Sequence, residues 1–358
     1  MADLDELAAR FRNFGRTAAA RAPLYGRLSD RIADSPEIVA LLHAAPEQQQ
    51  LPVLLFAAVH HLVLAGGDGL ELRRWYPNLW HDTNADDPFP AFSRFCDAHR
   101  AELQHLIASR TTQTNEVGRC AQFLPAFGLL AEEVGPLVHL DVGTSAGLNL
   151  LLPRFTYCYS PGGIVDGSLD GAAPIVLGCA TRGDPPVPAF MPSVALSVGL
   201  DIAPIDVHDD DAVRWLEACV WPDQPERFAR LVAAIELARS TGVDVRRGDA
   251  VDALPGLLVE VADHGHPVVT NSWVLNYLTG EQRLAYVAML ESIGAHRDLT
   301  WVLAESPAQT PELRIPTTEP AEDITVLSMV TWRRGERRVR RLATTHPHGF
   351  WLHWEAHG

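Results

Sequence analysis

The first 135 residues show the periodicity of amphipathic helices and no pattern typical of a strand. Residues 51–64 and 115–134 are apolar stretches of helical length, and Ser35-Pro36 resembles an N-cap followed by a proline in the first turn. The pattern therefore predicts an all-helical domain over residues 1–135. Its first apolar positions at helical spacing are Leu4, Leu7, Ala8, Phe11 and Phe14.

After residue 135 the pattern changes to short apolar runs that alternate with amphipathic stretches. The runs predicted as strands are residues 138–143, 194–204, 243–250, 267–274 and 299–306. The stretches predicted as helices are residues 209–220, 225–240, 251–262 and 280–293. This alternation of strand and helix predicts an α/β domain with a parallel, doubly wound sheet.

Three further segments complete the predicted domain. The runs ITVLSMVTW and RRVRRLATTH flank Gly335-Glu336 and predict an antiparallel hairpin that ends the sheet. LNLLLPRF predicts a helix limited by Pro153. Residues 160–192 are rich in Gly, Pro and Asp and predict an insertion with a hairpin around PIVLGCA. Five parallel strands with a closing hairpin are the arrangement of class I methyltransferases, so residues 136–358 predict a Rossmann-like domain of that type behind a helical cap.

The composition excludes several classes of chemistry. The formal charge of −16 disfavours broad nucleic-acid binding. All 29 basic residues are arginine, so P-loop NTPases, protein kinases and enzymes that need a lysine Schiff base are excluded. The five cysteines form no C-x-x-C pair, which disfavours cysteine-based zinc sites. No signal peptide or bilayer-length apolar run is found, so a cytoplasmic protein without membrane association is expected.

The stretch HLDVGTSAGLNL, residues 139–150, fits two unrelated motifs. As a G-x-S-x-G elbow it would make Ser145 the nucleophile of a hydrolase, with His346, His348 or His353 downstream. However, such hydrolases place several strands before the elbow, and here the loop follows the first predicted strand. As a cofactor loop it would bind a ligand through Gly143, Thr144, Ser145 and Gly147.

An acid two residues before the first glycine favours S-adenosylmethionine over a dinucleotide. Asp141 would lie near the positive amino end of that cofactor, where a pyrophosphate would be repelled. Ser145 occupies the usual place of a middle glycine. A third interpretation is a tight strand–helix turn of some other α/β fold.

Three later positions follow in methyltransferase order, each at the end of a predicted strand. Asp201 would accept the two ribose hydroxyls, or it is a turn or capping residue. Asp249 would accept the adenine amino group beside the Ala250 N–H, or it is the N-cap of the next helix. Asn271 and Ser272 would face the transferable methyl group, with Trp273 against the substrate, or they are a polar strand terminus.

Five stretches of this chain together resemble a bacterial family of unknown function, number 2332, over about residues 5–355. They are TQTNEVGRCAQFLPA, LDVGTSAGLNL, VGLDIAPID, RWLEACVWPDQPERFARL and RRGDAVDALP. That family is similar in fold to class I S-adenosylmethionine-dependent methyltransferases. The resemblance therefore implies this fold and this cofactor, with a substrate that it does not identify. Ser145 departs from the fuller glycine pattern, and the N-P-P-Y motif of base and amide N-methylation is absent.

Polar residues before the first strand are candidates for substrate and cofactor binding. Gln113, Asn115 and Glu116 are predicted to line the site between cap and sheet, and Arg119 to bind the cofactor carboxylate through a bidentate pair. The alternative makes Asn115 an N-cap with Glu116 in the first turn. Glu116, Tyr277 and Glu305 are the candidate general bases.

The remaining polar clusters carry structural predictions. His208 with Asp209–Asp211 indicates a helix N-terminus, because adjacent residues there do not converge on one metal ion. HDTNADD at residues 81–87 is a candidate loop for substrate contact or calcium, although it lacks the Gly and Glu of an EF-hand. RRGERRVRR predicts a solvated hairpin at the sheet edge, with binding of an anionic substrate or partner as the alternative. Strand alternation is expected to separate the three C-terminal histidines. The sequence thus favours a small-molecule methyltransferase, with a serine hydrolase or a non-catalytic binding or regulatory protein as alternatives.

Overall fold

The computed structural model describes residues 3–67, 71–82, 85–167, 175–309 and 324–355. The chain divides into two compact units. Unit 1 comprises Met1–Thr114 and Asp206–Ala233, and unit 2 comprises Asn115–Ile205 and Ala234–Gly358. The predicted boundary at residue 135 thus differs from the observed division, because residues 115–135 belong to unit 2 and a later segment belongs to unit 1.

Unit 1 is helical throughout its described residues, as the sequence predicts. Asp3 accepts the Glu6 N–H and caps the first helix, and prolines begin the next three α-helices. The apolar helix α4 is buried on nearly all sides, and its Phe56 stacks on Tyr25 with ring centroids 4.0 Å apart. The elements of unit 1 are α1 (Leu4–Ala18), α2 (Pro23–Ala33), α3 (Pro36–Val39), η1 (Ala40–Ala44), η2 (Glu47–Gln49), α4 (Pro52–Ala65), η4 (Leu72–Trp75), α5 (Phe89–Ala98), α6 (Arg100–Ser109) and α8 (Asp210–Ala218). Helix α9 (Pro225–Thr241) begins in unit 1 and ends in unit 2.

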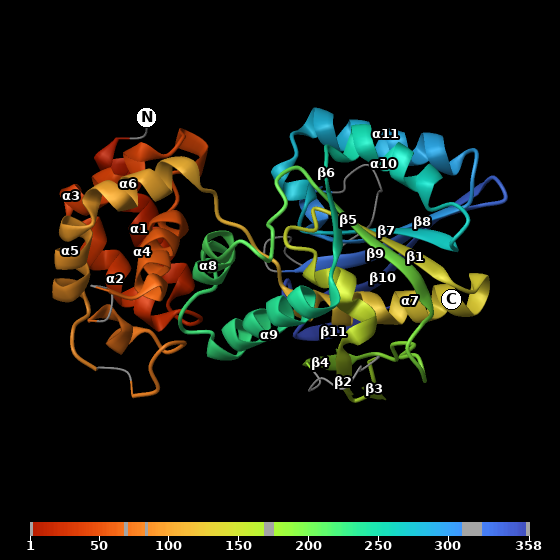
Figure 1. Cartoon of the computed structure of the whole chain (residues 1–358), viewed down its shortest axis with the longest axis horizontal. Coiled ribbons are helices and arrows are strands. Elements are labelled where there is room, and N and C mark those ends of the chain that lie inside the picture. Colours follow the sequence, from red (N-terminus) through yellow and green to blue (C-terminus); the bar gives the residue numbers. More distant parts are fainter. Residues whose placement is uncertain (1–2, 68–70, 83–84, 168–174, 310–323, 356–358) are drawn as a thin grey trace. The chain divides into compact units, whose positions relative to one another are not determined.

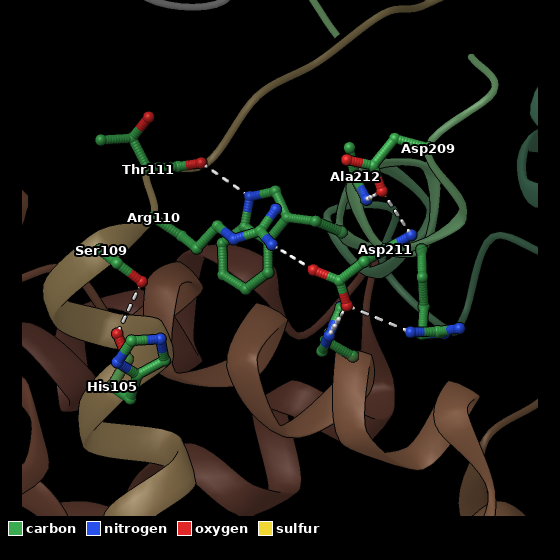
Figure 2. Close-up of polar contacts among 10 residues, drawn as sticks. His105, Ser109, Arg110, Thr111, Asp209, Asp211 and Ala212 are labelled. Atoms are coloured by element: carbon green, nitrogen blue, oxygen red, sulfur yellow. Dashed lines mark hydrogen bonds and ion pairs between the residues drawn. The ribbon is translucent and has the colours of Figure 1, made fainter. Parts of the chain in front are cut away.

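Asp211 links α8 to other segments of unit 1 through ion pairs (Figure 2). Its carboxylate pairs with Arg110 and lies 3.2 Å from both His61 Nε2 and Arg214 Nη1. Burial lowers the pKa of His61, an effect that the Asp211 charge opposes. Asp209 caps α8 by accepting the N–H groups of its second and third residues. The acidic run at the start of α8 therefore serves helix capping and ion pairing. In HDTNADD, residues 83–84 lie outside the described residues.

Unit 2 is built on one mixed sheet with the order β3-β2-β4-β11-β10-β9-β8-β7-β1-β5-β6. Strands β6, β5, β1, β7 and β8 are parallel to one another, and β9 runs antiparallel to β8. The strands are β1 (Leu137–Val142), β2 (Thr156–Ser160), β3 (Gly163–Val165), β4 (Val176–Arg182), β5 (Val194–Asp201), β6 (Asp244–Arg247), β7 (His266–Ser272), β8 (Leu299–Glu305), β9 (Thr325–Arg333), β10 (Glu336–Thr345) and β11 (Trp351–Trp354).

Helices cover both faces of this sheet (Figure 1). Apolar residues of α10 (Ala250–Glu260) and α11 (Gly280–Gly294) pack with Val138, Leu140 and Val142 of β1 in one core. Helix α7 (Cys120–Val134) lies against the other face, where Phe127 meets the His139 ring edge-on at 5.1 Å. The short helices of unit 2 are η5 (Val117–Arg119), η6 (Leu148–Arg154), η7 (Leu275–Tyr277) and η8 (Pro307–Gln309). The α/β class and the mostly parallel sheet are therefore confirmed.

The predicted hairpin at the end of the sheet is wrong in its position. Strands β9 and β10 do form the hairpin, but β11 pairs with β10 and, on its other side, with β4. Residues 156–182 supply three further strands, so the sheet continues beyond the C-terminal segment. The arginine-rich run 333–341 covers the turn of this hairpin and the first part of β10, which pairs with β9, whereas β11 pairs with β10 only at residues 343–345. The run is exposed or half-buried throughout, as predicted for a solvated hairpin, although β10 is an inner strand farther along.

The predicted insertion is also corrected. The segment PIVLGCA contains β4, which pairs in parallel with β2, whereas the hairpin is formed by β2 and β3. Strand β2 begins at Thr156, before the predicted insertion at residue 160. LNLLLPRF forms a 3₁₀ helix and not an α-helix. No helix in the described part of the chain is long and apolar enough to span a membrane.

Candidate active site

The chain order of the parallel strands reverses next to β1. From β1 the chain proceeds to β5 and β6 on one side, and then to β7 and β8 on the other. Sheets of this type bind ligands outside the carboxyl ends of the strands at such a switch point. The loops that follow β1, β5 and β7 therefore form the candidate site.

The loop after β1 is tightly wound. Gly143, Ser145 and Gly147 have φ angles of 73°, 57° and 74°. Residues other than glycine rarely adopt this region. A Cβ at Gly143 would come within 2.4 Å of Val274 Cγ2, and one at Gly147 within 2.5 Å of Val245 Cγ2. Both glycines are therefore required by the protein's own packing, and Ser145 is held in a strained conformation.

The backbone N–H groups of this loop donate hydrogen bonds to acceptors within the protein. The Ala146 and Leu148 N–H groups donate to Asn115 Oδ1 at 3.1 and 3.3 Å. The Gly143 and Thr144 N–H groups donate to the Leu200 carbonyl, and the Gly147 N–H to the Thr144 carbonyl. A pyrophosphate is bound by free backbone N–H groups, so this loop does not favour a phosphate-bearing ligand. Asn115 thus caps the loop, and the prediction that it is a helix N-cap is wrong. The N-cap of η5 is Glu116, whose side chain accepts the Gly118 N–H.

Two predicted cofactor acids stand at the ends of β5 and β6. Asp201 accepts the Ser145 and Ala203 N–H groups, each at 2.8 Å, one on each carboxylate oxygen. Asp249 accepts the Val251 N–H at 2.8 Å and is the N-cap of α10, whose first residue is Ala250. The N-cap interpretation of Asp249 is thus confirmed, and its contact with adenine stays a prediction.

Asp141 is buried at the carboxyl end of β1. Its Oδ1 accepts the Thr270 hydroxyl at 2.7 Å. Burial raises the pKa of Asp141 to about 6, while the hydroxyl groups of Thr270 and Thr144 and, less strongly, the Arg119 charge oppose that rise. The Asp141 side chain is therefore ionised at neutral pH and becomes protonated when the pH falls below about 6.

Asn271 and Glu305 form a second buried network, at the ends of β7 and β8. Glu305 Oε1 accepts Asn271 Nδ2 at 2.6 Å and the Val274 N–H at 2.9 Å. Asn271 Oδ1 in turn accepts the Trp301 indole N–H. Burial raises the pKa of Glu305 to about 7, and its Oε2 has no hydrogen-bond partner among the described residues. Both ends of the Asn271 amide thus contact protein, and Glu305 Oε2 is a buried oxygen without a hydrogen-bond partner among the described residues.

Arg119 connects two loops at this end of the sheet. Its Nε donates to the Pro347 carbonyl at 2.9 Å and its Nη1 to the Ser272 carbonyl at 3.1 Å. Next to Ser272, Trp273 has a φ of 58° and donates its indole N–H to Thr325 at 2.8 Å. The guanidinium is 7% exposed and lowers the pKa of both Asp141 and Glu305. Arg119 is thus a buried cation held by backbone carbonyls.

The other predicted residues are scattered. Gln113 belongs to unit 1, whereas Asn115, Glu116 and Arg119 belong to unit 2. Tyr277, on η7, is 73% exposed, unlike the buried Glu305 and Glu116. The prediction that strand alternation separates the histidines is wrong for His346 and His348. Both precede β11 in a turn, with ring centroids 5.5 Å apart.

Sequence reasoning missed His139 and Thr270. His139 Nε2 lies 2.8 Å from Thr270 Oγ1, the hydroxyl that contacts Asp141. His139 and Asp141 are two residues apart on an otherwise apolar strand, so they lie on the same side of the sheet. That spacing could have indicated a shared role for His139 and Asp141. The position of Thr270 opposite Asp141 follows only from the register of β1 and β7, which the sequence does not give.

The chain matches a family model described as "Uncharacterized protein conserved in bacteria (DUF2332)" over residues 8–354, and it belongs to that family. No match is found among curated proteins. The family membership indicated by the five sequence stretches is therefore confirmed.

Proposed function

We propose that this protein binds S-adenosylmethionine at the carboxyl ends of β1, β5 and β6 and methylates a small molecule. The observation that carries the proposal is the chemistry of the strand ends. Asp141, Asp201, Asp249 and Glu305 supply carboxylate oxygens there, while the loop N–H groups are already accepted. Such an end favours a ligand that carries positive charge and hydroxyl groups over one that carries phosphates.

The residues fit this cofactor. Each oxygen of Asp201 accepts one backbone N–H and retains a further lone pair, so the carboxylate can still accept two ribose hydroxyls. Asp141 would face the ammonium end of the ligand with a charge that its buried contacts maintain. When bound, the cofactor supplies a methyl group that is already activated by the sulfonium. The protein then contributes mainly alignment, which provides roughly 7–11 kcal/mol at best.

Glu305 is the better of the candidate bases for an acceptor with an O–H or N–H group. Its Oε2 has no partner among the described residues, and its pKa of about 7 is close to the value that suits proton transfer at neutral pH. Tyr277 is exposed on the surface, and Glu116 Oε1 is engaged with the Gly118 N–H. This assignment supports an acceptor that loses a proton on methylation.

A serine hydrolase is the alternative favoured by one observation, the positive φ of Ser145 on a strand–turn–helix. In a hydrolase the N–H of the following residue stabilises the oxyanion, but the Ala146 N–H donates to Asn115 Oδ1. Ser145 is also 6% exposed. A fluorophosphonate probe is therefore expected to leave Ser145 unlabelled, and labelling lost in Ser145→Ala would support the hydrolase.

Calorimetric titration with S-adenosylmethionine and S-adenosylhomocysteine tests the cofactor. The wild-type protein is expected to bind both, and Asp201→Ala to weaken binding by about tenfold or more, because two hydroxyl contacts are lost. Asp263→Ala is the matched control, since this exposed carboxylate lies in the turn before β7, at the opposite end of the strand. Absence of binding by the wild-type protein contradicts the proposal. Binding without product across a broad acceptor panel supports a non-catalytic protein.

A further inference from the structure

A buried chain of hydrogen bonds ends on the carboxylate of Asp141. His139 Nε2 lies 2.8 Å from Thr270 Oγ1, and Thr270 Oγ1 lies 2.7 Å from Asp141 Oδ1. The three side chains are 1%, 0% and 4% exposed. Asp141 and Thr270 are register partners on the adjacent parallel strands β1 and β7, beside the switch point.

The direction of these hydrogen bonds follows from the proton inventory. A carboxylate only accepts, so the single Thr270 proton points to Asp141. The Thr270 oxygen must then accept from His139, which places the histidine proton on Nε2. His139 Nδ1 has no partner among the described residues, and its ring packs edge-on against Phe127. Burial lowers the pKa of His139 to about 3, so the ring is neutral.

This arrangement opposes protonation of Asp141 at the oxygen that Thr270 contacts. With a proton there, the Thr270 hydroxyl would have to turn toward His139, and the ring would have to carry its proton on Nδ1. No described residue accepts a proton at Nδ1. A buried donor left without an acceptor is costly. Neutral His139 thus fixes Thr270 as a donor, and the Thr270 hydrogen bond to Asp141 Oδ1 favours the ionised form of Asp141.

We propose that His139 and Thr270 are positioning residues that keep Asp141 oriented and ionised for a cationic ligand at the carboxyl end of β1. The nature of that ligand rests on the proposed function, whereas the effect on Asp141 does not. Other groups from the surrounding elements also act on Asp141: the Arg119 charge favours its ionised form, and the Asp201 charge disfavours it. The Cys120 thiol and the Tyr286 hydroxyl, from α7 and α11, are two further titratable groups that interact with it.

If the His139–Thr270 pair had a purely structural role, it would only link β1 to β7. The chain contains a similar pair that serves as a matched control. His266 Nε2 lies 2.8 Å from Thr300 Oγ1, a second histidine–threonine pair that joins the neighbouring strands β7 and β8. Both of its residues are near the amino ends of their strands, and this pair is not hydrogen-bonded to a carboxylate of the described residues. Thr300→Val therefore removes an equivalent link between strands and leaves the Asp141 chain intact.

The experiment follows the Asp141 carboxyl resonance by ¹³C NMR across pH, in full-length protein labelled at aspartate carboxyls and assigned with Asp141→Asn. Thr270→Val is expected to raise the pKa of Asp141 by about one unit, and Thr300→Val to leave it unchanged. Thr270→Ser keeps the hydroxyl and is expected to restore the wild-type titration. An Asp141 pKa that is the same in Thr270→Val and in wild type overturns the proposal.

A second pair of variants keeps the test decisive if Thr270→Val does not fold. His139→Leu removes the donor to Thr270, and His139→Gln retains one. His139→Leu is expected to raise the pKa of Asp141 and His139→Gln to preserve it; equal values in the two overturn the proposal. In parallel, S-adenosylmethionine is expected to bind Thr270→Val about threefold more weakly than wild type near pH 6.5, because the ionised fraction of Asp141 falls by that factor when its pKa rises by one unit. If wild type binds no S-adenosylmethionine but the Asp141 titration shifts as expected, the cofactor assignment fails and the positioning role stands.

Discussion

Replacing Arg119 with leucine is expected to lower the free energy of unfolding by about 3–5 kcal/mol. The substitution removes two hydrogen bonds from a charged donor to the carbonyls of Pro347 and Ser272. It also removes the cation that lowers the pKa of Asp141 and of Glu305, so two buried carboxylates lose a favourable interaction. Urea denaturation at pH 7.5, followed by circular dichroism, measures the change.

Two variants separate the charge from the geometry. Arg119→Lys keeps the positive charge but lacks the planar fork that reaches two carbonyls, so an intermediate loss is expected. Arg338→Leu breaks an exposed pair with Glu336, where the arginine side chain is 74% exposed, and is expected to cost less than 1 kcal/mol. If Arg119→Leu costs no more than Arg338→Leu, Arg119 does not hold the two loops together.

The parallel half of the sheet could be predicted because β1, β5, β7 and β8 are short apolar runs and amphipathic helical stretches alternate with them along the chain. The opposite half could not. Strand β2 reads TYCYS, and β3 follows through Pro161 and two glycines, which resemble a loop. Strand β2 pairs with β3 and β4, and β4 pairs in turn with β11, whose Trp351 is 171 residues from its register partner Ala180. Such pairings depend on tertiary contacts that local periodicity does not contain.

The site was predictable as far as it lies at strand ends. Asp141, Asp201 and Asn271 each follow an apolar run, so the sequence brings them to one edge of the sheet. What each side chain contacts was not predictable, because that depends on register and on distant segments. Asn115 caps a loop 31 residues away, and Arg119 contacts a carbonyl 228 residues away. The sequence therefore indicates where the polar groups gather, and the structure determines which of them are already occupied.

Replacing Glu305 with glutamine is expected to change how stability depends on pH. Burial raises the pKa of Glu305 in the folded protein to about 7, from an ordinary value of 4.5. An acid with a raised pKa binds a proton more tightly in the folded state. Its contribution to stability is therefore fully present below pH 4.5 and is lost as the pH rises through 7. A shift of this size corresponds to about 3 kcal/mol.

The glutamine variant keeps the hydrogen-bonding geometry but does not titrate. Its Oε1 can still accept the Asn271 amide and the Val274 N–H. The stability of wild type relative to Glu305→Gln is thus expected to rise by about 3 kcal/mol as the pH falls from 8 to 4.5. At pH 8 wild type carries a buried charge at Glu305 and the glutamine variant carries none. The free energy of unfolding of wild type relative to the variant is therefore lowest at that pH.

The difference between the two proteins is the informative quantity, because the wild-type profile alone combines opposing titrations. Burial lowers the pKa of His60 to about 4 and of His139 to about 3, so both oppose folding as the pH falls below 6.5. These histidines are present in both proteins and cancel in the difference. Val326→Ala, at the register partner of Glu305 on β9, removes apolar contacts without removing a titrating group. Its difference from wild type is expected to stay constant with pH. A constant difference for Glu305→Gln as well, measured by urea denaturation at the same pH values, would show that Glu305 titrates alike in the folded and unfolded chain and is unsuited to act as a base near neutral pH.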